Sequence, residues 1–234
     1  MNWLIIAAGG NGTRMGFGMN KIFAKINNKP IIYWTLKNFE DNRLVDKIII
    51  SAKPDDFQSL KKIIKKNNFK KIIKIILAEK SRQESTFKVL KWLKSRINKN
   101  DLVGVHNAVN PFVFNKEIEE VYKSAKKYGA ALLAKPAKDT IKITDKNLFI
   151  STTPLRETVW HAQTPQVAIF HKLYKAFVKA DKDNFLGTDD TQLLERINLK
   201  AKIIHCNQWN FKITFPEELI LARRVLEDFN KKNV

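Results

Sequence analysis

Short apolar runs recur along this chain, and lysine-rich stretches with helical spacing separate them. Phe57, Leu60, Ile63 and Ile64 follow the helical period, as do Val89, Leu90, Leu93 and Ile97. Because strands that alternate with helices imply right-handed crossovers, the pattern predicts a Rossmann-like wound α/β fold, with a mostly parallel sheet and helices on both faces. The strand-like runs are residues 3–7, 47–52, 72–78, 101–106, 130–134 and 201–205, and later helices are expected at 171–180, 190–197 and 216–229.

The alternating pattern breaks between about residues 138 and 160. Residues 140–144 alternate polar and apolar positions, a turn signal follows at 145–147, and residues 148–152 can return as a partner strand. This predicts a β-hairpin arm that protrudes from the sheet. A two-stranded hairpin is marginal alone, so we expect a second subunit to cover it and the protein to be a homodimer. With no internal repeat or linker, residues 1–234 are expected to form a single domain.

A glycine-rich segment directly follows the first predicted strand, at the edge where open α/β sheets bind ligands. Glycines let backbone N–H groups approach an oxyanion, while Arg14 and Lys21 supply positive charge for phosphate oxygens. The segment therefore predicts a polyphosphate ligand. Its glycines match neither the dinucleotide fingerprint nor the Walker loop, so a simple turn after an edge strand is the alternative. The residues in question are Ala8, Gly9, Gly10, Asn11, Gly12, Thr13, Arg14, Met15 and Gly16.

Composition narrows the class of protein. The chain has 234 residues, 44% of them hydrophobic, and a net charge of +20. Of its 43 basic residues eight are Arg, which leaves 35 Lys spread over predicted helix faces, so nucleic-acid binding is not favoured, although the field would attract small anions. No apolar run is long enough for a membrane span, and the N-terminus enters a strand without a targeting signal. We expect a cytoplasmic enzyme with no membrane association. The single cysteine, Cys206, excludes an intramolecular disulfide.

Two later segments carry candidate chemistry. Asp189 and Asp190 follow Thr188, and we favour a helix-capping role for them over metal binding. Lys212 comes shortly before Pro216, which can begin the last helix, so we expect it on a short strand or bend. It could also be one more surface lysine.

Taken in order, seven motifs resemble the cytidylyltransferases that act on 2-C-methyl-D-erythritol 4-phosphate. They are the glycine loop with its Arg and following Lys, Arg82-Gln83-Glu84-Ser85, His106-Asn107-Ala108-Val109-Asn110-Pro111, Asp139-Thr140-Ile141-Lys142, the segment from Arg156 through Trp160 to Gln166, Thr188-Asp189-Asp190, and the segment from Asn210 to Glu217. The resemblance covers about residues 3–222. The loop and the Ala-Val before Pro111 are also similar to the ribitol-5-phosphate cytidylyltransferases, whereas Trp160 and residues 139–142 favour the methylerythritol enzymes.

The resemblance implies transfer of CMP from CTP to a polyol phosphate, with Mg²⁺ as the cofactor. It implies that Arg14 and Lys21 hold the triphosphate, and that Lys21 and Lys212 face the α-phosphate. The nucleotide contacts it implies are Ala8, Gly9, Gly10, Asn11, Gly12, Ser85 and Asn107. Thr140 and Arg156, on the arm, would bind the sugar phosphate across a homodimer, although a surface Arg in a loop is the alternative for Arg156.

The chain departs from the family pattern at two places. Asn107 and Asn110 stand where the family usually has an Asp and an Arg. An amide supplies no anionic charge, so no metal-ligating residue is assigned and Mg²⁺ is expected mainly on the CTP phosphates. Ala78 and Glu79 replace a glycine pair, which restricts φ and puts a carboxylate near the nucleotide. A non-catalytic descendant that binds a nucleotide is therefore the second hypothesis.

Overall fold

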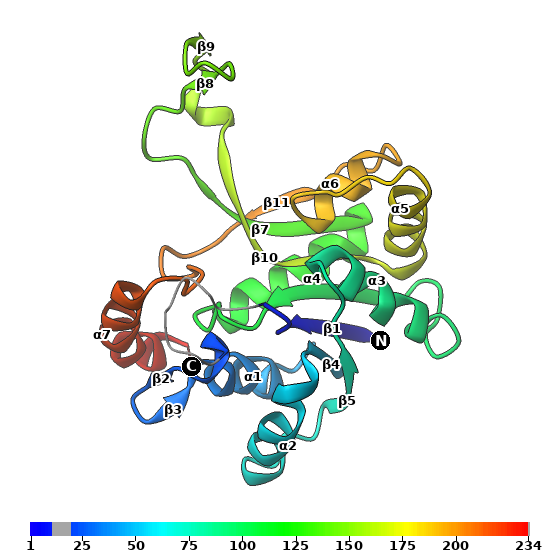
Figure 1. Ribbon diagram of the computed structural model, residues 1–234, viewed down its shortest axis with the longest axis vertical. Coiled ribbons are helices and arrows are strands. Elements are labelled where there is room, and N and C mark those ends of the chain that lie inside the picture. The colour runs from blue at the N-terminus through cyan, green and yellow to red at the C-terminus, as the bar shows by residue number, and fades with distance from the viewer. Residues whose placement is uncertain (11–19, 234) are drawn as a thin grey trace.

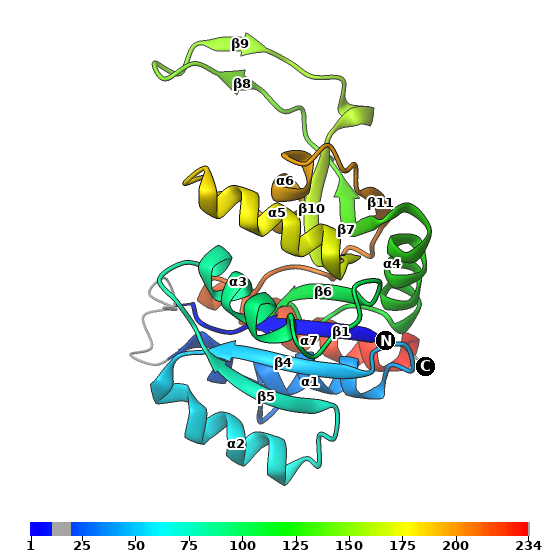
Figure 2. The same ribbon diagram turned by 90° about the vertical axis from the view of Figure 1, so that its right-hand side faces the viewer.

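The computed structural model describes residues 1–10 and 20–233, which form a seven-stranded sheet between two layers of helices, with an arm standing off the body (Figures 1 and 2). The strand order is β11-β7-β10-β6-β1-β4-β5. The strands are β1 (Asn2–Ala7), β4 (Lys47–Ala52), β5 (Ile72–Leu77), β6 (Leu102–Asn107), β7 (Ala130–Pro136), β10 (Trp160–Ile169) and β11 (Lys202–His205). Each of the six predicted strand ranges overlaps one of them, so the predicted wound α/β fold is confirmed.

One strand of the sheet was not predicted. β10 runs antiparallel to both β6 and β7, while the remaining pairs of neighbours are parallel. Pro165 lies in its middle, where the sequence argues against a central strand, and the pairing shifts register between Ala162 and Gln166. Pairing with β6 and β7 on its two sides, and not local propensity, makes this segment a strand.

The two faces of the sheet bury separate apolar clusters. Leu4 and Ile6 of β1 point into one cluster, whereas Trp3 and Ile5 point into the other, as the period of a strand requires. The first is covered by α1 (Ile31–Asp41), α2 (Phe57–Lys66), α4 (Asn115–Tyr128) and α7 (Pro216–Lys232), and the second by α3 (Arg82–Leu93), α5 (Phe170–Lys182) and α6 (Asp190–Glu195). In the described ranges no helix is both long and apolar enough to cross a membrane.

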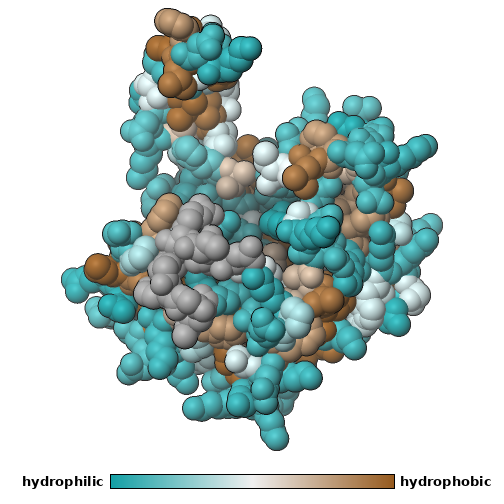
Figure 3. All heavy atoms as spheres, in the orientation of Figure 1, coloured by the Kyte–Doolittle hydropathy of each residue, from teal (hydrophilic) through white to brown (hydrophobic). Residues whose placement is uncertain are grey.

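The arm is the predicted hairpin, with a shorter ladder than expected. Its strands are β8 (Ile143–Thr144) and β9 (Ile150–Thr152), which pair antiparallel. The Asp145 carboxylate closes the turn by accepting from the backbone N–H groups of Asn147, at 2.9 Å, and Phe149, at 3.0 Å. Apolar side chains gather on the arm (Figure 3), and those most exposed are Leu148, Phe149, Ile150 and Leu155. The arm therefore has no apolar core of its own.

Two short antiparallel strands, β2 (Lys25–Ile26) and β3 (Lys29–Pro30), lead from the pocket region into α1. They follow a 3₁₀ helix, η2 (Lys21–Phe23), which begins the second described range. Two further 3₁₀ turns are η3 (Pro54–Asp56), before α2, and η4 (Arg156–Thr158), at the return of the arm.

Candidate active site

A pocket of about 280 Å³ opens at the carboxyl ends of β1, β4 and β6. This is where a wound sheet leaves a crevice for ligands. Six described segments line it: the end of β1 with the first glycines, the start of η2, the end of β4, the loop before α3 with its first turn, the end of β6, and the segment between β11 and α7. Its described lining is Ala7, Ala8, Gly9, Gly10, Asn20, Lys21, Ile22, Ser51, Glu79, Lys80, Ser81, Arg82, Ser85, Asn107, Val109 and Lys212.

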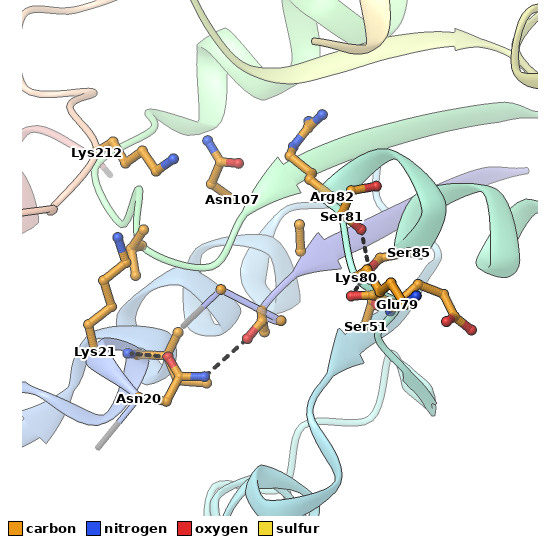
Figure 4. A pocket seen from close by; sticks show the side chains of 16 residues that line it. Asn20, Lys21, Ser51, Glu79, Lys80, Ser81, Arg82, Ser85, Asn107 and Lys212 are labelled. Atoms are coloured by element: carbon orange, nitrogen blue, oxygen red, sulfur yellow. Dashed lines mark hydrogen bonds between the residues drawn. The ribbon is translucent and has the colours of Figure 1, made fainter. Parts of the chain in front are cut away.

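Two lysines that are far apart in sequence line this one pocket. Lys21 and Lys212 extend toward the same space from different sides (Figure 4). Lys212 lies in a loop, where no strand forms, and the adjacent Ile213 N–H donates to the Val109 carbonyl at 2.9 Å. Their ammonium groups give the pocket a positive wall, suited to phosphate oxygens.

Asn20 fixes the position of Lys21. Its side-chain oxygen accepts from the Ile22 N–H at 3.3 Å and so caps η2. Its Nδ2 donates to the Ala8 carbonyl at 3.2 Å and to the Asp56 carboxylate at 2.6 Å. The residue before Lys21 is thus tied to the end of β1, and Lys21 itself is only 9% exposed. Sequence reasoning did not single out Asn20, although Asn is a common capping residue.

The two glycines of the predicted loop that the structure describes, Gly9 and Gly10, have different environments. A Cβ on Gly9 would lie 2.5 Å from the Ala78 Cβ, whereas one on Gly10 would meet no heavy atom within 4 Å. Gly9 is therefore required by close packing of the β1 end against the loop after β5. The other predicted loop residues, Asn11, Gly12 and Arg14, lie outside the described residues.

The loop before α3 is ordered by its own side chains. Ser85 Oγ donates to the Ser81 carbonyl at 2.7 Å and accepts from the Glu79 N–H at 2.8 Å. Ser81 and Glu84 form a capping box at the start of α3. Ser85, expected among the nucleotide contacts, thus lines the pocket and also holds the backbone of this loop.

Glu79, whose carboxylate is expected near the nucleotide, lines the pocket, but Lys88 from outside the lining holds that carboxylate. Its Oε1 pairs with Lys88 Nζ at 2.5 Å, and the side chain points away from Lys21 and Lys212 (Figure 4). Neither Ala78 nor Glu79 is among the described residues with positive φ. The replacement of the glycine pair is therefore accommodated without backbone strain.

Sequence reasoning missed an ion pair beside the pocket. Arg82 Nη2 lies 2.5 Å from Asp190 Oδ2, whose side chain is almost fully buried. Burial opposes the charged guanidinium, but Asp190 outweighs it, and the pKa of Arg82 is raised. Asp189 caps α6 by accepting from the Gln192 N–H at 2.8 Å, which confirms the predicted capping role for that residue. Both acids are thus committed to protein partners.

The arm residues predicted to bind the sugar phosphate lie apart from this pocket. Arg156 Nη2 donates to Thr140 Oγ1 at 3.3 Å, and both side chains are exposed. Neither residue lines the pocket of its own chain. The structure therefore brings together Lys21, Lys212, Asn107, Ser85 and the first glycines, and leaves Thr140 and Arg156 as a separate pair.

A lysine-walled pocket at the carboxyl ends of a wound, mostly parallel sheet defines an α/β protein with a site for an anionic, nucleotide-like ligand. The chain belongs to the 2-C-methyl-D-erythritol 4-phosphate cytidylyltransferase family, whose sequence profile matches residues 2–228. The cytidylyltransferase of that name from Clostridium tetani is 36% identical over 229 residues, which are 98% of this chain and 92% of the relative. The one from Clostridium botulinum is 37% identical and covers 97% of both chains.

Solved structures agree with the fold. The 4-diphosphocytidyl-2C-methyl-D-erythritol synthase of Anaerococcus prevotii superposes with a TM-score of 0.85 at 28% identity, over 97% of this chain and 96% of that one. The 2-C-methyl-D-erythritol 4-phosphate cytidylyltransferase of Francisella tularensis gives a TM-score of 0.77 at 30% identity, over 95% and 98%. The likeness extends over nearly the whole chain, so the body and the arm are both parts of the family's fold.

Proposed function

We propose that this protein is a cytidylyltransferase that transfers CMP from CTP to 2-C-methyl-D-erythritol 4-phosphate, releases pyrophosphate, and supplies isoprenoid precursor biosynthesis. Family membership over residues 2–228 supports the reaction. The observation that supports this reaction for the present chain is that Lys21 and Lys212 line one pocket at the end of β1.

We place the enzyme in the cytoplasm, where free thiols such as that of the buried Cys206 are kept reduced.

In this reaction a phosphate oxygen of the polyol attacks the α-phosphorus of CTP. The new P–O bond forms while the bond from the α-phosphorus to the bridging oxygen of the β-phosphate breaks, and pyrophosphate leaves. Both reactants are anions, so the protein must reduce their repulsion and hold them in line. The ammonium groups of Lys21 and Lys212 are placed to stabilise the charge that develops on the α-phosphate oxygens. The nucleophile is already anionic, so no general base is needed.

Mg²⁺ is the proposed cofactor, and the residues present fit a cation that is held mainly by the nucleotide. Among the described residues no group of three or more His, Cys, Asp or Glu could hold a metal ion. Asn107 lines the pocket and offers an amide oxygen, a suitable ligand for a hard cation. When bound, Mg²⁺ would neutralise charge on the triphosphate and on the departing pyrophosphate.

We propose a homodimer in which the arm serves the partner's site. The exposed apolar side chains of the arm, from Leu148 to Leu155, form a surface that a second copy would cover. Thr140 and Arg156 would then reach the polyol phosphate of the other subunit, where Arg156 can donate two parallel hydrogen bonds. This arrangement explains why Thr140 and Arg156, the candidates for binding the polyol phosphate, lie apart from the pocket of the same chain.

Pyrophosphate release tests the proposed reaction. The purified protein is given CTP and Mg²⁺ with either 2-C-methyl-D-erythritol 4-phosphate or ribitol 5-phosphate, side by side. We expect turnover with the first and little with the second. Preferred turnover of ribitol 5-phosphate would reassign the substrate.

The amides at positions 107 and 110 favour a second candidate function, that of a non-catalytic nucleotide-binding protein. Binding of CTP in a calorimeter, without turnover of either polyol phosphate, would support this candidate.

A further inference from the structure

A line of three side-chain amides runs from the pocket into the interior. Asn107 Nδ2 donates to Asn110 Oδ1 at 3.3 Å, and Asn110 Nδ2 donates to Asn210 Oδ1 at 3.2 Å. Asn210 Nδ2 ends the line by donating to the Thr164 main-chain carbonyl at 3.0 Å. Asn110 is 1% exposed and Asn210 is fully buried, so water does not compete for the bond between them or for the bond from Asn210 to Thr164. The line joins β6 to β10 and to the segment that carries Lys212.

The Thr164 carbonyl gives this line a fixed direction. A carbonyl oxygen only accepts, so Asn210 must present its NH₂ group to it and its own oxygen to Asn110. Asn110 must then donate to Asn210 and accept from Asn107. The NH₂ of Asn107 is thereby turned inward, and its Oδ1 is the atom left for the pocket that Asn107 lines beside Lys212 and Arg82 (Figure 4). A reversed Asn107 would place two oxygens against each other.

The main chain of Asn210 is held as firmly as its side chain. Its N–H donates to Asn207 Oδ1 at 3.1 Å, and its carbonyl accepts from Lys135 Nζ at 3.1 Å. Asn207 is in turn anchored by the buried Glu117, which accepts from its Nδ2 at 2.7 Å. Lys212 follows only two residues later. The position of its backbone is thus set by contacts that converge on Asn210.

We infer that Asn110 and Asn210 are positioning residues for the transfer reaction, because their buried amides orient Asn107 with its oxygen toward the pocket and register the Lys212 segment against β6. This inference rests on the proposed function. According to this inference, the amide at position 110 accepts a hydrogen bond from Asn107 and donates one to Asn210. The side chain at 107 then offers an acceptor for a cation or for a hydroxyl of the ligand, and not a donor for phosphate.

Asn110→Asp tests the direction of the line. A protonated Asp reproduces the amide, since its carbonyl accepts from Asn107 and its O–H donates to Asn210, whereas the ionised form cannot donate. Burial raises the pKa of such a carboxyl above its usual value of about 4. We therefore expect kcat at saturating CTP to be about ten- to hundredfold below wild type at pH 8.5, where the carboxylate leaves Asn210 Oδ1 without the donor at position 110, and to recover toward wild type as the pH falls to about 6.

The ratio of variant to wild-type kcat isolates this titration from other groups near position 110. These are His106, Lys135, Glu117, Cys206 and Lys212. Burial lowers the pKa of His106, whose Nε2 lies 2.9 Å from the Asn110 carbonyl, to about 4. Burial also lowers the pKa of Lys135 and raises the pKa values of Glu117 and Cys206. All five are present in both proteins, so the ratio at each pH compares proteins with the same neighbouring groups.

Asn42→Asp is the matched control. Asn42 is also 1% exposed and donates its Nδ2 to Asn115, but it lies at the end of α1 and does not line the pocket. It should lose stability without a pH-dependent loss of kcat. A ratio for Asn110→Asp that stays flat with pH, or that Asn42→Asp reproduces, would overturn the inference.

Two further measurements keep the test decisive. If Asn110→Asp does not fold, Asn110→Ser, whose hydroxyl both donates and accepts, should retain more kcat than Asn110→Ala, and equal losses would contradict the inference.

If the wild type turns over neither polyol phosphate, the proposed function fails by itself. The line of amides is then tested by calorimetry with CTP and Mg²⁺, where Asn110→Asp should bind about tenfold more weakly than wild type at pH 8.5 and equally at pH 6. Equal binding at both pH values would reject it.

Discussion

The pocket and the arm differ in how far their side chains are buried and held by contacts within the chain. At the pocket, Lys21, Asn110 and Asn210 are at most 9% exposed, and the two amides have their hydrogen bonds to neighbours from other segments. On the arm, Leu148 is 81% and Phe149 72% exposed, and the two strands share a short ladder. A single chain can thus order the pocket by itself, whereas the arm lacks the buried contacts that would fix it. This difference supports the proposal that a second copy covers the arm.

The largest effect is expected at the pocket. Lys212→Ala removes a positive group that we place at the α-phosphate, and one such contact is worth about 10²- to 10³-fold in kcat. Initial rates of pyrophosphate release measure the loss, while circular dichroism checks that the fold is retained. Lys61→Ala, which removes an exposed lysine of α2, is the control for a general effect of net charge. Wild-type kcat in Lys212→Ala would show that the pocket is not where the chemistry occurs.

An intermediate effect is expected on the arm. Arg156→Ala removes the proposed clamp on the polyol phosphate, a charge-assisted contact worth about 1.5–3 kcal/mol, so KM for 2-C-methyl-D-erythritol 4-phosphate should rise about ten- to hundredfold. KM for CTP should stay within about twofold, because the arm is proposed to touch only the second substrate. Saturation curves for each substrate separate the two. An equal rise in KM for CTP would mean that Arg156 affects the binding of both substrates, which would contradict its proposed contact with the polyol phosphate alone.

The smallest effect is on stability and concerns the packing of the pocket wall. Gly9→Ala forces a methyl group against Ala78, and overpacking of this kind costs about 1–3 kcal/mol. Gly10→Ala meets open space and should cost about 1 kcal/mol or less. Urea unfolding of both variants compares them directly. Equal midpoints would show that the contact between Gly9 and Ala78 is not tight in solution.

Much of the body followed from the hydrophobic pattern, because β1, β4 and β6 are buried on both faces and read as continuous apolar runs. The helical stripes of α2 and α3 were equally readable. β10 was missed because its pairing with β6 and β7 supplies what its sequence lacks. The arm was predicted from alternation in residues 140–152, but its ladder is shorter, since nothing in the described chain packs on it to extend the pairing.

The candidate site was predicted less evenly. Lys21 could be proposed from the glycine loop beside it, whereas Lys212 was one lysine among 35 until the resemblance singled it out. The pair formed by Arg82 and Asp190 joins residues 108 positions apart, and the contact of Asn110 with Asn210 spans 100. Local pattern carries no signal for such contacts, which arise only when the fold brings α3 beside α6 and the end of β6 beside the Lys212 segment.

Mixed subunits provide the most direct test of the central claim, that each site combines the lysines of one chain with the arm of another. Lys212→Ala and Arg156→Ala proteins are unfolded together in equal amounts, refolded, and assayed for pyrophosphate release with CTP and 2-C-methyl-D-erythritol 4-phosphate. Random pairing in a two-fold dimer gives one intact site in half of the dimers, so activity should recover to about a quarter of wild type. Activity no higher than the average of the two variants alone would contradict the account.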